Sequence, residues 1–169
     1  MSIKTIAGWS AGAVAIAVAG TFLLPREVHV ERTATIAAAP QAILELAASN
    51  TGYQAFNPYH DFDPELKIAP FGPASGVGSG FAFDSKDGAG TQTVAAVSAQ
   101  QVTYALDLGP LGQPMQAIEA LPVEGGTQVT WSMDADMGFN PLFRVMGLFM
   151  DDMMGATFEQ GLSNLEEAV

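Results

Sequence analysis

Hydrophobic and polar positions alternate with two different periods along this chain. Residues 28–36 read VHVERTATI, in which β-branched and polar positions alternate every second residue, as in a half-buried strand. Comparable segments predict six further strands, at 61–68, 79–84, 91–99, 101–108, 115–121 and 127–137. Short turns rich in Gly and Pro separate most of them, so consecutive strands should pair in an antiparallel sheet.

Three segments have a helical pattern instead. Residues 40–48 and 52–59 are short and follow the first strand, whereas 140–165 is long. Asn140 can cap the long helix and Pro141 suits its first position. Roughly 26 residues at 1.5 Å each give a rod of about 40 Å. A lone rod of that length must bury one face on the sheet, which predicts an α+β class.

The long helix does not present one continuous apolar face. At 100° per residue, the first half carries a stripe formed by Leu142, Met146, Phe149 and Met153. The second half carries a differently oriented stripe formed by Phe158, Leu162 and Leu165. We therefore predict a bend or a change of burial face near Gly155. The Met-rich first half would line or gate a cavity, and the second half would clamp onto the sheet.

The N-terminal residues 5–24 form an uncharged segment of 20 residues. At helical rise such a segment spans about 30 Å, the thickness of a bilayer core. This predicts a single-pass anchor over residues 1–26 and a domain over residues 27–169, with the domain outside the cytoplasm. A cleaved signal peptide, suggested by Ala17-Val18-Ala19, and a buried core helix are the alternatives.

Charge and composition exclude several functions. The net charge is −12 with only six basic residues, which disfavours binding to nucleic acid or to anionic lipid. The chain has no cysteine, so disulfides and thiol catalysis are excluded. Carboxylate pairs such as Asp61 with Asp63 and Asp134 with Asp136 lack further ligands at matching spacing, and no Gly-x-Ser-x-Gly motif occurs. We expect no metal and no cofactor.

Several motifs resemble those of a known family. They are LPREVHVER at 24–32, GPASGVG at 72–78, GGTQVTW at 125–131, NPLFRVMG at 140–147 and FEQGLSNL at 158–165. Together they resemble the START-like, helix-grip superfamily, specifically bacterial polyketide cyclase/dehydrase and SRPBCC-type proteins. The resemblance implies a curved antiparallel sheet of about seven strands wrapped on the long C-terminal helix, two short helices after the first strand, and an apolar cavity between. Where members often have Ser-Pro-Trp, this chain has Asn57-Pro58-Tyr59.

The predicted cavity wall combines aromatic and apolar positions of the strands and the long helix. In 127–137, Trp131 and Met133 belong to the apolar face, and in 101–108 Tyr104 and Leu106 do. The candidate ligand-binding residues are Phe56, Tyr59, Phe81, Phe83, Tyr104, Leu106, Trp131, Met133, Met146, Phe149 and Met153. The alternative is that these side chains fill a solid core.

Three functions remain open at this point. The first is binding of a hydrophobic small molecule or lipid-like ligand, and it follows from an apolar pocket without a catalytic set. The second is a cyclase or dehydrase-like enzyme, for which Tyr104, His60 and Asp107 are the available polar candidates. The third is an interaction protein that pairs through its helix or anchor. His29 should face outward from the first strand, and His60 should lie in a solvated loop.

Overall fold

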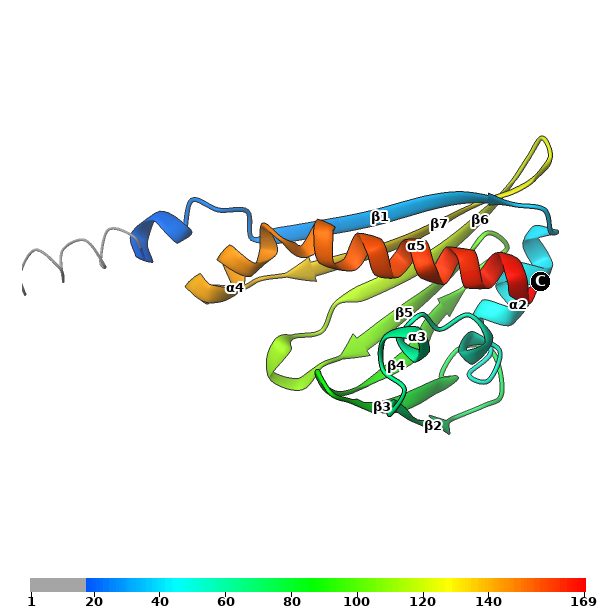
Figure 1. The fold of residues 1–169 in the computed structure, drawn as a ribbon, viewed down its shortest axis with the longest axis horizontal. Coiled ribbons are helices and arrows are strands. Elements are labelled where there is room, and N and C mark those ends of the chain that lie inside the picture. The colour runs from blue at the N-terminus through cyan, green and yellow to red at the C-terminus, as the bar shows by residue number, and fades with distance from the viewer. Residues whose placement is uncertain (1–17) are drawn as a thin grey trace, which may run out of the picture.

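One antiparallel sheet of seven strands forms the body of the molecule, in the order β1-β7-β6-β5-β4-β3-β2 (Figure 1). The structure is a computed structural model, and it describes residues 18–169. The strands are β1 (Glu27–Ile36), β2 (Lys67–Phe71), β3 (Gly80–Ser85), β4 (Gly88–Val97), β5 (Gln101–Asp107), β6 (Met115–Val123) and β7 (Gly126–Asp136). The first and last strands of the chain pair with each other. An antiparallel sheet combined with a long C-terminal helix confirms the predicted α+β class.

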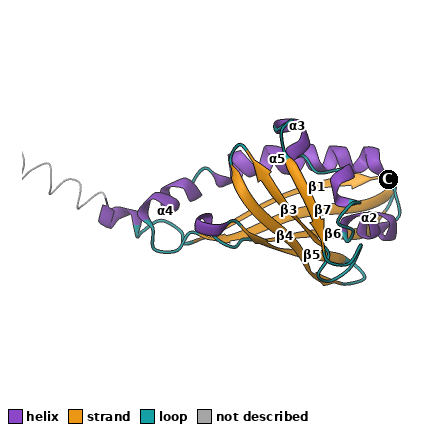
Figure 2. Cartoon of the chain, turned by 90° about the horizontal axis from the view of Figure 1, so that it is seen from below, coloured by secondary structure: helices purple, strands orange, loops and turns teal. Residues whose placement is uncertain are grey.

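The helices gather on the concave side of this sheet (Figures 1 and 2). They are α2 (Pro40–Ala47), the 3₁₀ turn η1 (Tyr53–Ala55), α3 (Tyr59–Phe62), the 3₁₀ turn η2 (Gly109–Leu111), α4 (Pro141–Gly147) and α5 (Met150–Ala168). The long helix α5 runs along β1 and β7, and α2 lies across the end of β5 and β6. The elements therefore follow the predicted helix-grip arrangement.

Alternation along β7 explains how the sheet acquires its buried face. Val129, Trp131 and Met133 are buried, whereas Gln128 and Asp134, which flank this segment on the other face of the strand, are exposed. The same alternation on β5 and β6 adds Val102, Tyr104, Ile118 and Ala120 to that face. The predicted orientation of the last strand is confirmed.

The predicted rod at 140–165 is two helices rather than one. The Asn140 side chain accepts the amide of Leu142 at 3.0 Å, as expected of the cap. After α4, the amides of Leu148 and Phe149 bond three residues back, to Val145 and Met146, at 3.2 and 3.0 Å. Such bonds tighten the turn and end the α-helix. The α-helix is therefore interrupted at Leu148–Phe149, whereas Gly155 lies inside α5, so the prediction of a bend near Gly155 is wrong.

Gly155 has a different purpose in the fold. Arg32, on the concave face of β1, passes directly over it, and a Cβ at Gly155 would collide with the guanidinium. Arg32 binds Asp151 with Nη1–Oδ1 at 2.9 Å and Glu159 with Nε–Oε1 at 2.9 Å, one turn to either side of the glycine. The missing side chain thus lets one arginine tie α5 to β1.

Two strand boundaries differ from the sequence prediction. The predicted loop 85–90 is only a tight turn, because β3 continues to Ser85 and β4 begins at Gly88. The predicted strand 61–68 begins as the helix α3, and its strand starts only at Lys67. The edge strand β2 contains Pro70, which has no amide to donate and suits an edge.

Most of the uncharged segment 5–24 lies outside the residues that the structure describes, and so does the predicted anchor. Within residues 18–169, no helix is both long enough and apolar enough to cross a bilayer. The part of the segment that is described is attached to the domain by Arg144, whose guanidinium donates to the carbonyls of Leu24 at 2.8 Å and Gly138 at 2.9 Å. The chain therefore leaves the domain beside α4.

Candidate functional site

A cavity of about 380 Å³ lies between the concave face of the sheet and the helices α4 and α5. Its walls come from β2 to β7, from η1, α3 and the turn η2, and from the α4–α5 segment. Sites for small organic ligands have about this size and are mostly apolar. This cavity is the strongest candidate for a functional site among residues 18–169.

Methionine dominates the helix side of the cavity. Six of the eight methionines of the chain line it: Met133, Met137, Met146, Met150, Met153 and Met154. Thioether side chains are flexible and polarisable, so they adapt to ligands of different shape. The sheet side is more rigid, with Phe81, Phe83, Leu106 and Ile68. The cavity thus has one adaptable wall and one fixed wall.

Two buried glutamines interrupt the apolar sheet wall. Gln92 on β4 is paired with Leu106, and Gln116 on β6 is paired with Tyr104, so both project from the concave face. The Gln116 carbonyl accepts the indole N–H of Trp131 at 3.2 Å. Its NH₂ group has only the sulfur of Met133, at 4.0 Å. Gln116 is therefore oriented by Trp131 and retains donor capacity toward the cavity.

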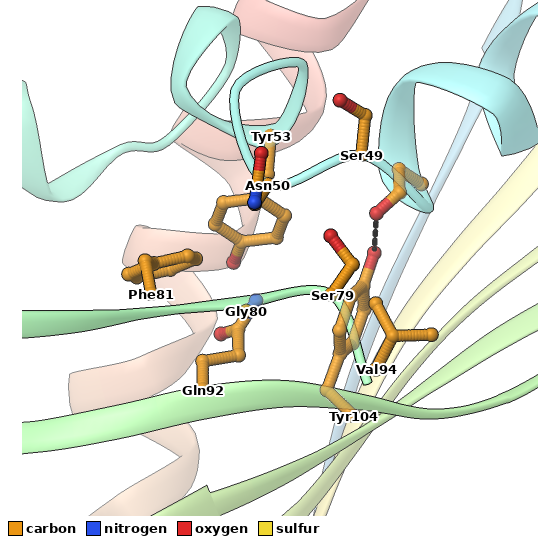
Figure 3. Close-up of a pocket in the computed structure, with 10 residues that line it drawn as sticks. Ser49, Asn50, Tyr53, Ser79, Gly80, Phe81, Gln92, Val94 and Tyr104 are labelled. Carbon is orange, nitrogen blue, oxygen red and sulfur yellow. Dashed lines mark hydrogen bonds between the residues drawn. The ribbon is translucent and has the colours of Figure 1, made fainter. Parts of the chain in front are cut away.

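Tyr53 of η1 adds a phenol beside Gln92 (Figure 3). Burial raises the pKa of Tyr53 well above its ordinary value. The hydroxyl consequently stays protonated at any physiological pH. Tyr53, Gln92 and Gln116 form what we call the polar wall, a set of neutral hydrogen-bonding groups without a charge.

Three of the four charged side chains that line the cavity, Asp63, Lys86 and Asp136, are held by hydrogen bonds. Asp136 binds Arg26, which lowers the pKa of this carboxyl to about 2. Asp63 accepts the backbone amides of Lys86 at 2.9 Å and Glu65 at 3.1 Å, so its pKa is also lowered. These bonds fix the loops around the opening. The fourth charged group, Asp87, is exposed in the turn between β3 and β4.

A much smaller cavity, of about 10 Å³, lies behind the polar wall (Figure 3). Tyr104 lines it and donates its hydroxyl to the carbonyl of Ala47 at 2.9 Å. The Ser79 hydroxyl beside it is fully buried without a hydrogen-bond partner in the described chain. The space is about that of one water molecule, which would satisfy Ser79. Tyr104 therefore links α2 to the sheet.

Seven of the eleven predicted ligand-binding residues line the large cavity, and four do not. Those that line the large cavity are Tyr59, Phe81, Phe83, Leu106, Met133, Met146 and Met153. Phe56 and Trp131 lie instead in a solid aromatic core, and Tyr104 lines only the small cavity. Phe149 is exposed at the junction of α4 and α5 and is absent from the lining.

None of the three polar candidates for catalysis enters the large cavity. The Tyr104 hydroxyl is bonded to Ala47, and Asp107 is exposed and accepts the amide of Gly109 at 2.9 Å. His60 is exposed and bonds Gln54 at 3.2 Å. His29 faces outward, as predicted, and its hydrogen bond with Asp134 raises its pKa. Neither histidine is among the residues that line the cavity, and His60 lies in α3 rather than in the predicted loop.

The polar wall was not predicted from the sequence, and neither were three of the six methionines that line the cavity, Met137, Met150 and Met154. Gln92 alternates with Val94, and Gln116 alternates with Ile118 and Ala120, so each glutamine occupies a position of the apolar face. A polar residue in an otherwise apolar row is the signal that could have identified them. For Tyr53, no such signal exists, because η1 has no regular period.

Comparison with known proteins agrees with this architecture. Residues 27–169 match the model of a family described as polyketide cyclase / dehydrase and lipid transport. The chain belongs to this family. No curated protein matches the chain.

Solved structures share the fold at low sequence identity. The di-domain ARO/CYC protein StfQ from the steffimycin biosynthetic pathway aligns with a TM-score of 0.61 and 13% identity, over 83% of this chain and 50% of that one. The chain thus spans about half the length of StfQ. CV1439 from Chromobacterium violaceum aligns with a TM-score of 0.59 and 12% identity, over 86% and 98% of the two chains. NE0264 from Nitrosomonas europaea aligns at 0.58 and 13%, over 83% and 93%.

Proposed function

We propose that this protein binds a neutral, mostly apolar small molecule that carries carbonyl or hydroxyl oxygens. The observation that carries the proposal is the cavity of about 380 Å³, which is lined mainly by apolar side chains and contains the uncharged polar wall. An apolar body would pack against the methionines and phenylalanines, where burial of its surface is favourable. An oxygen of the ligand would accept hydrogen bonds from the Gln92 or Gln116 amide or from the Tyr53 hydroxyl.

The polar wall favours neutral ligands over anions. Taking an ion out of water is costly unless a paired charge compensates it, and Tyr53, Gln92 and Gln116 carry none. Lys86 lies at the rim, but its ammonium group donates to the carbonyl of Phe62 at 3.0 Å. Fatty acids and phospholipids with anionic headgroups would therefore bind more weakly than a ketone or alcohol of the same size.

A matched pair of ligands tests this function. Isothermal titration would compare 2-acetylnaphthalene with 2-ethylnaphthalene, which differ mainly in one carbonyl group. We expect the ketone to bind more tightly, and the Gln92→Leu variant to reduce that preference by about threefold to tenfold, the value of one hydrogen bond. Gln128→Leu, the same change on the exposed face of β7, is the control.

The results separate the parts of the proposal. If neither compound binds to the folded protein, the cavity is not a binding site of this class. If both bind equally well to the natural protein and to Gln92→Leu, the polar wall does not recognise oxygen. A preference that Gln128→Leu removes as well would contradict the assignment to the cavity.

A cyclase or dehydrase-like activity is the second candidate, and the family match supports it. The observation in its favour is the protonated phenol of Tyr53 within the cavity, because a neutral hydroxyl can polarise a ketone without a change of charge. Incubation with a linear poly-β-keto thioester tests it by chromatography of the products. A substrate that is bound and recovered unchanged would contradict the enzymatic function and leave the binding function intact.

We further propose that residues 5–24 anchor the chain in a membrane, with the domain outside the cytoplasm. The support is the uncharged stretch of 20 residues and its position next to the domain. Carbonate extraction of cell membranes tests the anchor. A chain released by carbonate would contradict it, and protease access to intact cells or vesicles would report the side.

A further inference from the structure

Large exposed apolar side chains cluster at one end of the molecule. Among the described residues, the large apolar side chains that are more than half exposed are Leu23, Val77, Leu111, Phe139, Leu142, Leu148, Phe149 and Met153. All of them except Val77 belong to the segment before β1, the turn η2, or the region from the end of β7 to the first turn of α5. These elements lie at the end opposite α2 (Figure 1).

We infer that this end inserts into the surface of a lipid bilayer, so that the mouth of the cavity faces the membrane. We call the surface formed by Leu23, Phe139, Leu142, Leu148 and Phe149 the apolar end. Leu142 is 70% exposed and Phe139 71%. Apolar patches of this kind on a soluble domain mark sites for a protein or membrane partner. The inference rests on the proposed anchor and adds to it a second contact with the bilayer.

The attachment of the N-terminal segment favours a membrane as the occupant. Arg144 on α4 holds the carbonyl of Leu24, and its guanidinium lies 5.7 Å from the ring centre of Phe22. The last residues of the uncharged segment are therefore in contact with the apolar end. A bilayer that contains residues 5–24 would meet α4 first.

The position of the cavity gives this contact a purpose. Leu111, Phe143, Met146 and Met153 line the cavity, and they belong to the elements that carry the apolar end or adjoin it. A ligand that partitions into lipid could pass from the bilayer to the cavity without crossing bulk water. The apolar class of the proposed ligand and the apolar class of the surface thus agree.

Charge determines which lipid the surface fits. Near the apolar end, Arg26 is paired with Asp136 and Arg144 is occupied by backbone carbonyls, while Asp151 is bound to Arg32 and Asp152 is exposed. No free basic group is therefore present in this set to attract anionic headgroups. Insertion must depend on apolar burial, and a zwitterionic bilayer suffices.

The absence of cysteine from the chain permits a direct test. Single cysteines introduced as Leu142→Cys, Phe149→Cys and Val77→Cys would carry a polarity-sensitive nitrobenzoxadiazole probe on the full-length protein in phosphatidylcholine vesicles. Val77 is the matched control, because it is 64% exposed and lies in the loop that pairs with Ser49 near the end of α2. Ala13→Cys would report insertion of the proposed anchor independently.

We expect lipids with doxyl-labelled chains to quench the probes at Leu142 and Phe149 several-fold more than the probe at Val77. Quenching at Ala13 without quenching at Leu142 and Phe149 would overturn the inference and keep the anchor. Quenching at Leu142 and Phe149 without Ala13 would support docking and remove the anchor. Equal quenching at Val77, or quenching that requires added phosphatidylglycerol, would contradict a specific apolar contact.

Discussion

The two ends of the space between α5 and the sheet are filled in different ways. Beneath the C-terminal half of α5, Trp131 stacks on Phe158 with ring centres 5.3 Å apart, and Tyr53 and Phe56 pack edge-on against the same indole. Beneath α4 and the start of α5, methionines border the cavity of about 380 Å³. We refer to these as the solid half and the hollow half.

The contrast arises from how closely the helix approaches. In the solid half, Gly161 lies directly on the Trp131 ring, so the helix backbone itself covers the sheet. In the hollow half, the α-helix is interrupted at Leu148–Phe149, and partly buried side chains lie between the helices and the sheet. The same sheet face thus provides stability at one end and space for a ligand at the other.

The largest expected effect is truncation of the indole in the solid half. Trp131→Ala should lower the free energy of unfolding by about 3–5 kcal/mol, because it creates a large cavity among side chains that cannot collapse. Met146→Ala in the hollow half should cost about 1 kcal/mol or less, since Met146 already borders empty space. Chemical denaturation measures both, and equal costs would contradict the division into halves.

A smaller effect is expected from adding a methyl group at Gly161, where α5 lies against the Trp131 ring. A Cβ at Gly161 would overlap the Trp131 ring, so Gly161→Ala should destabilise the fold by about 1–3 kcal/mol despite the better helix propensity of alanine. Gly147→Ala in α4 is a milder comparison, because its Cβ would lie 3.0 Å from Val28 and 3.2 Å from Met137, whose side chains can move more easily than the indole ring. Thermal unfolding should show a smaller loss for Gly147→Ala than for Gly161→Ala. A stabilised Gly161→Ala would mean that the helix is not held on the indole.

The smallest expected effect is the acid sensitivity of the hollow half. Arg26 lowers the pKa of Asp136 to about 2, from an ordinary value near 3.9. The carboxylate therefore contributes stability above pH about 4, and this contribution is lost as the pH falls toward 2. Both side chains are about half exposed, so solvent screens the pair and the change is small.

Asp136→Asn isolates that contribution. The variant should be slightly less stable than the natural protein at pH 7, and the difference should disappear near pH 2. Thermal midpoints measured across this range provide the comparison. A difference that persists unchanged at pH 2 would contradict a role for the ionised carboxylate.

Local patterns located most of the strands and helices, and the family resemblance supplied their arrangement. Period-2 alternation located β1, β5, β6 and β7 to within about two residues, and Asn140-Pro141 marked the start of α4. The break at Leu148–Phe149 was not predictable in this way, because no proline interrupts the pattern there. A bend or a change of burial face was predicted near Gly155, but the role of this glycine depends on Arg32, which is distant in sequence.

The candidate site was predictable only in part. Trp131 and Met133 share one face of β7 and were both placed in the cavity, yet only Met133 lines it. The distinction depends on where α5 contacts the sheet, which no single strand encodes. For the same reason Phe149, which belongs to the apolar stripe by spacing, is exposed, since the helix break turns it away from the cavity.

The methionine wall has a chemical consequence of its own. Six thioethers face one cavity, and oxidation converts each thioether into a polar, chiral sulfoxide. Sulfoxides would replace the adaptable apolar wall with strong hydrogen-bond acceptors, while the aromatic solid half has no comparable oxidation site among its stacked rings. Peroxide would therefore end ligand binding before it unfolds the domain, and a sulfoxide reductase would restore it.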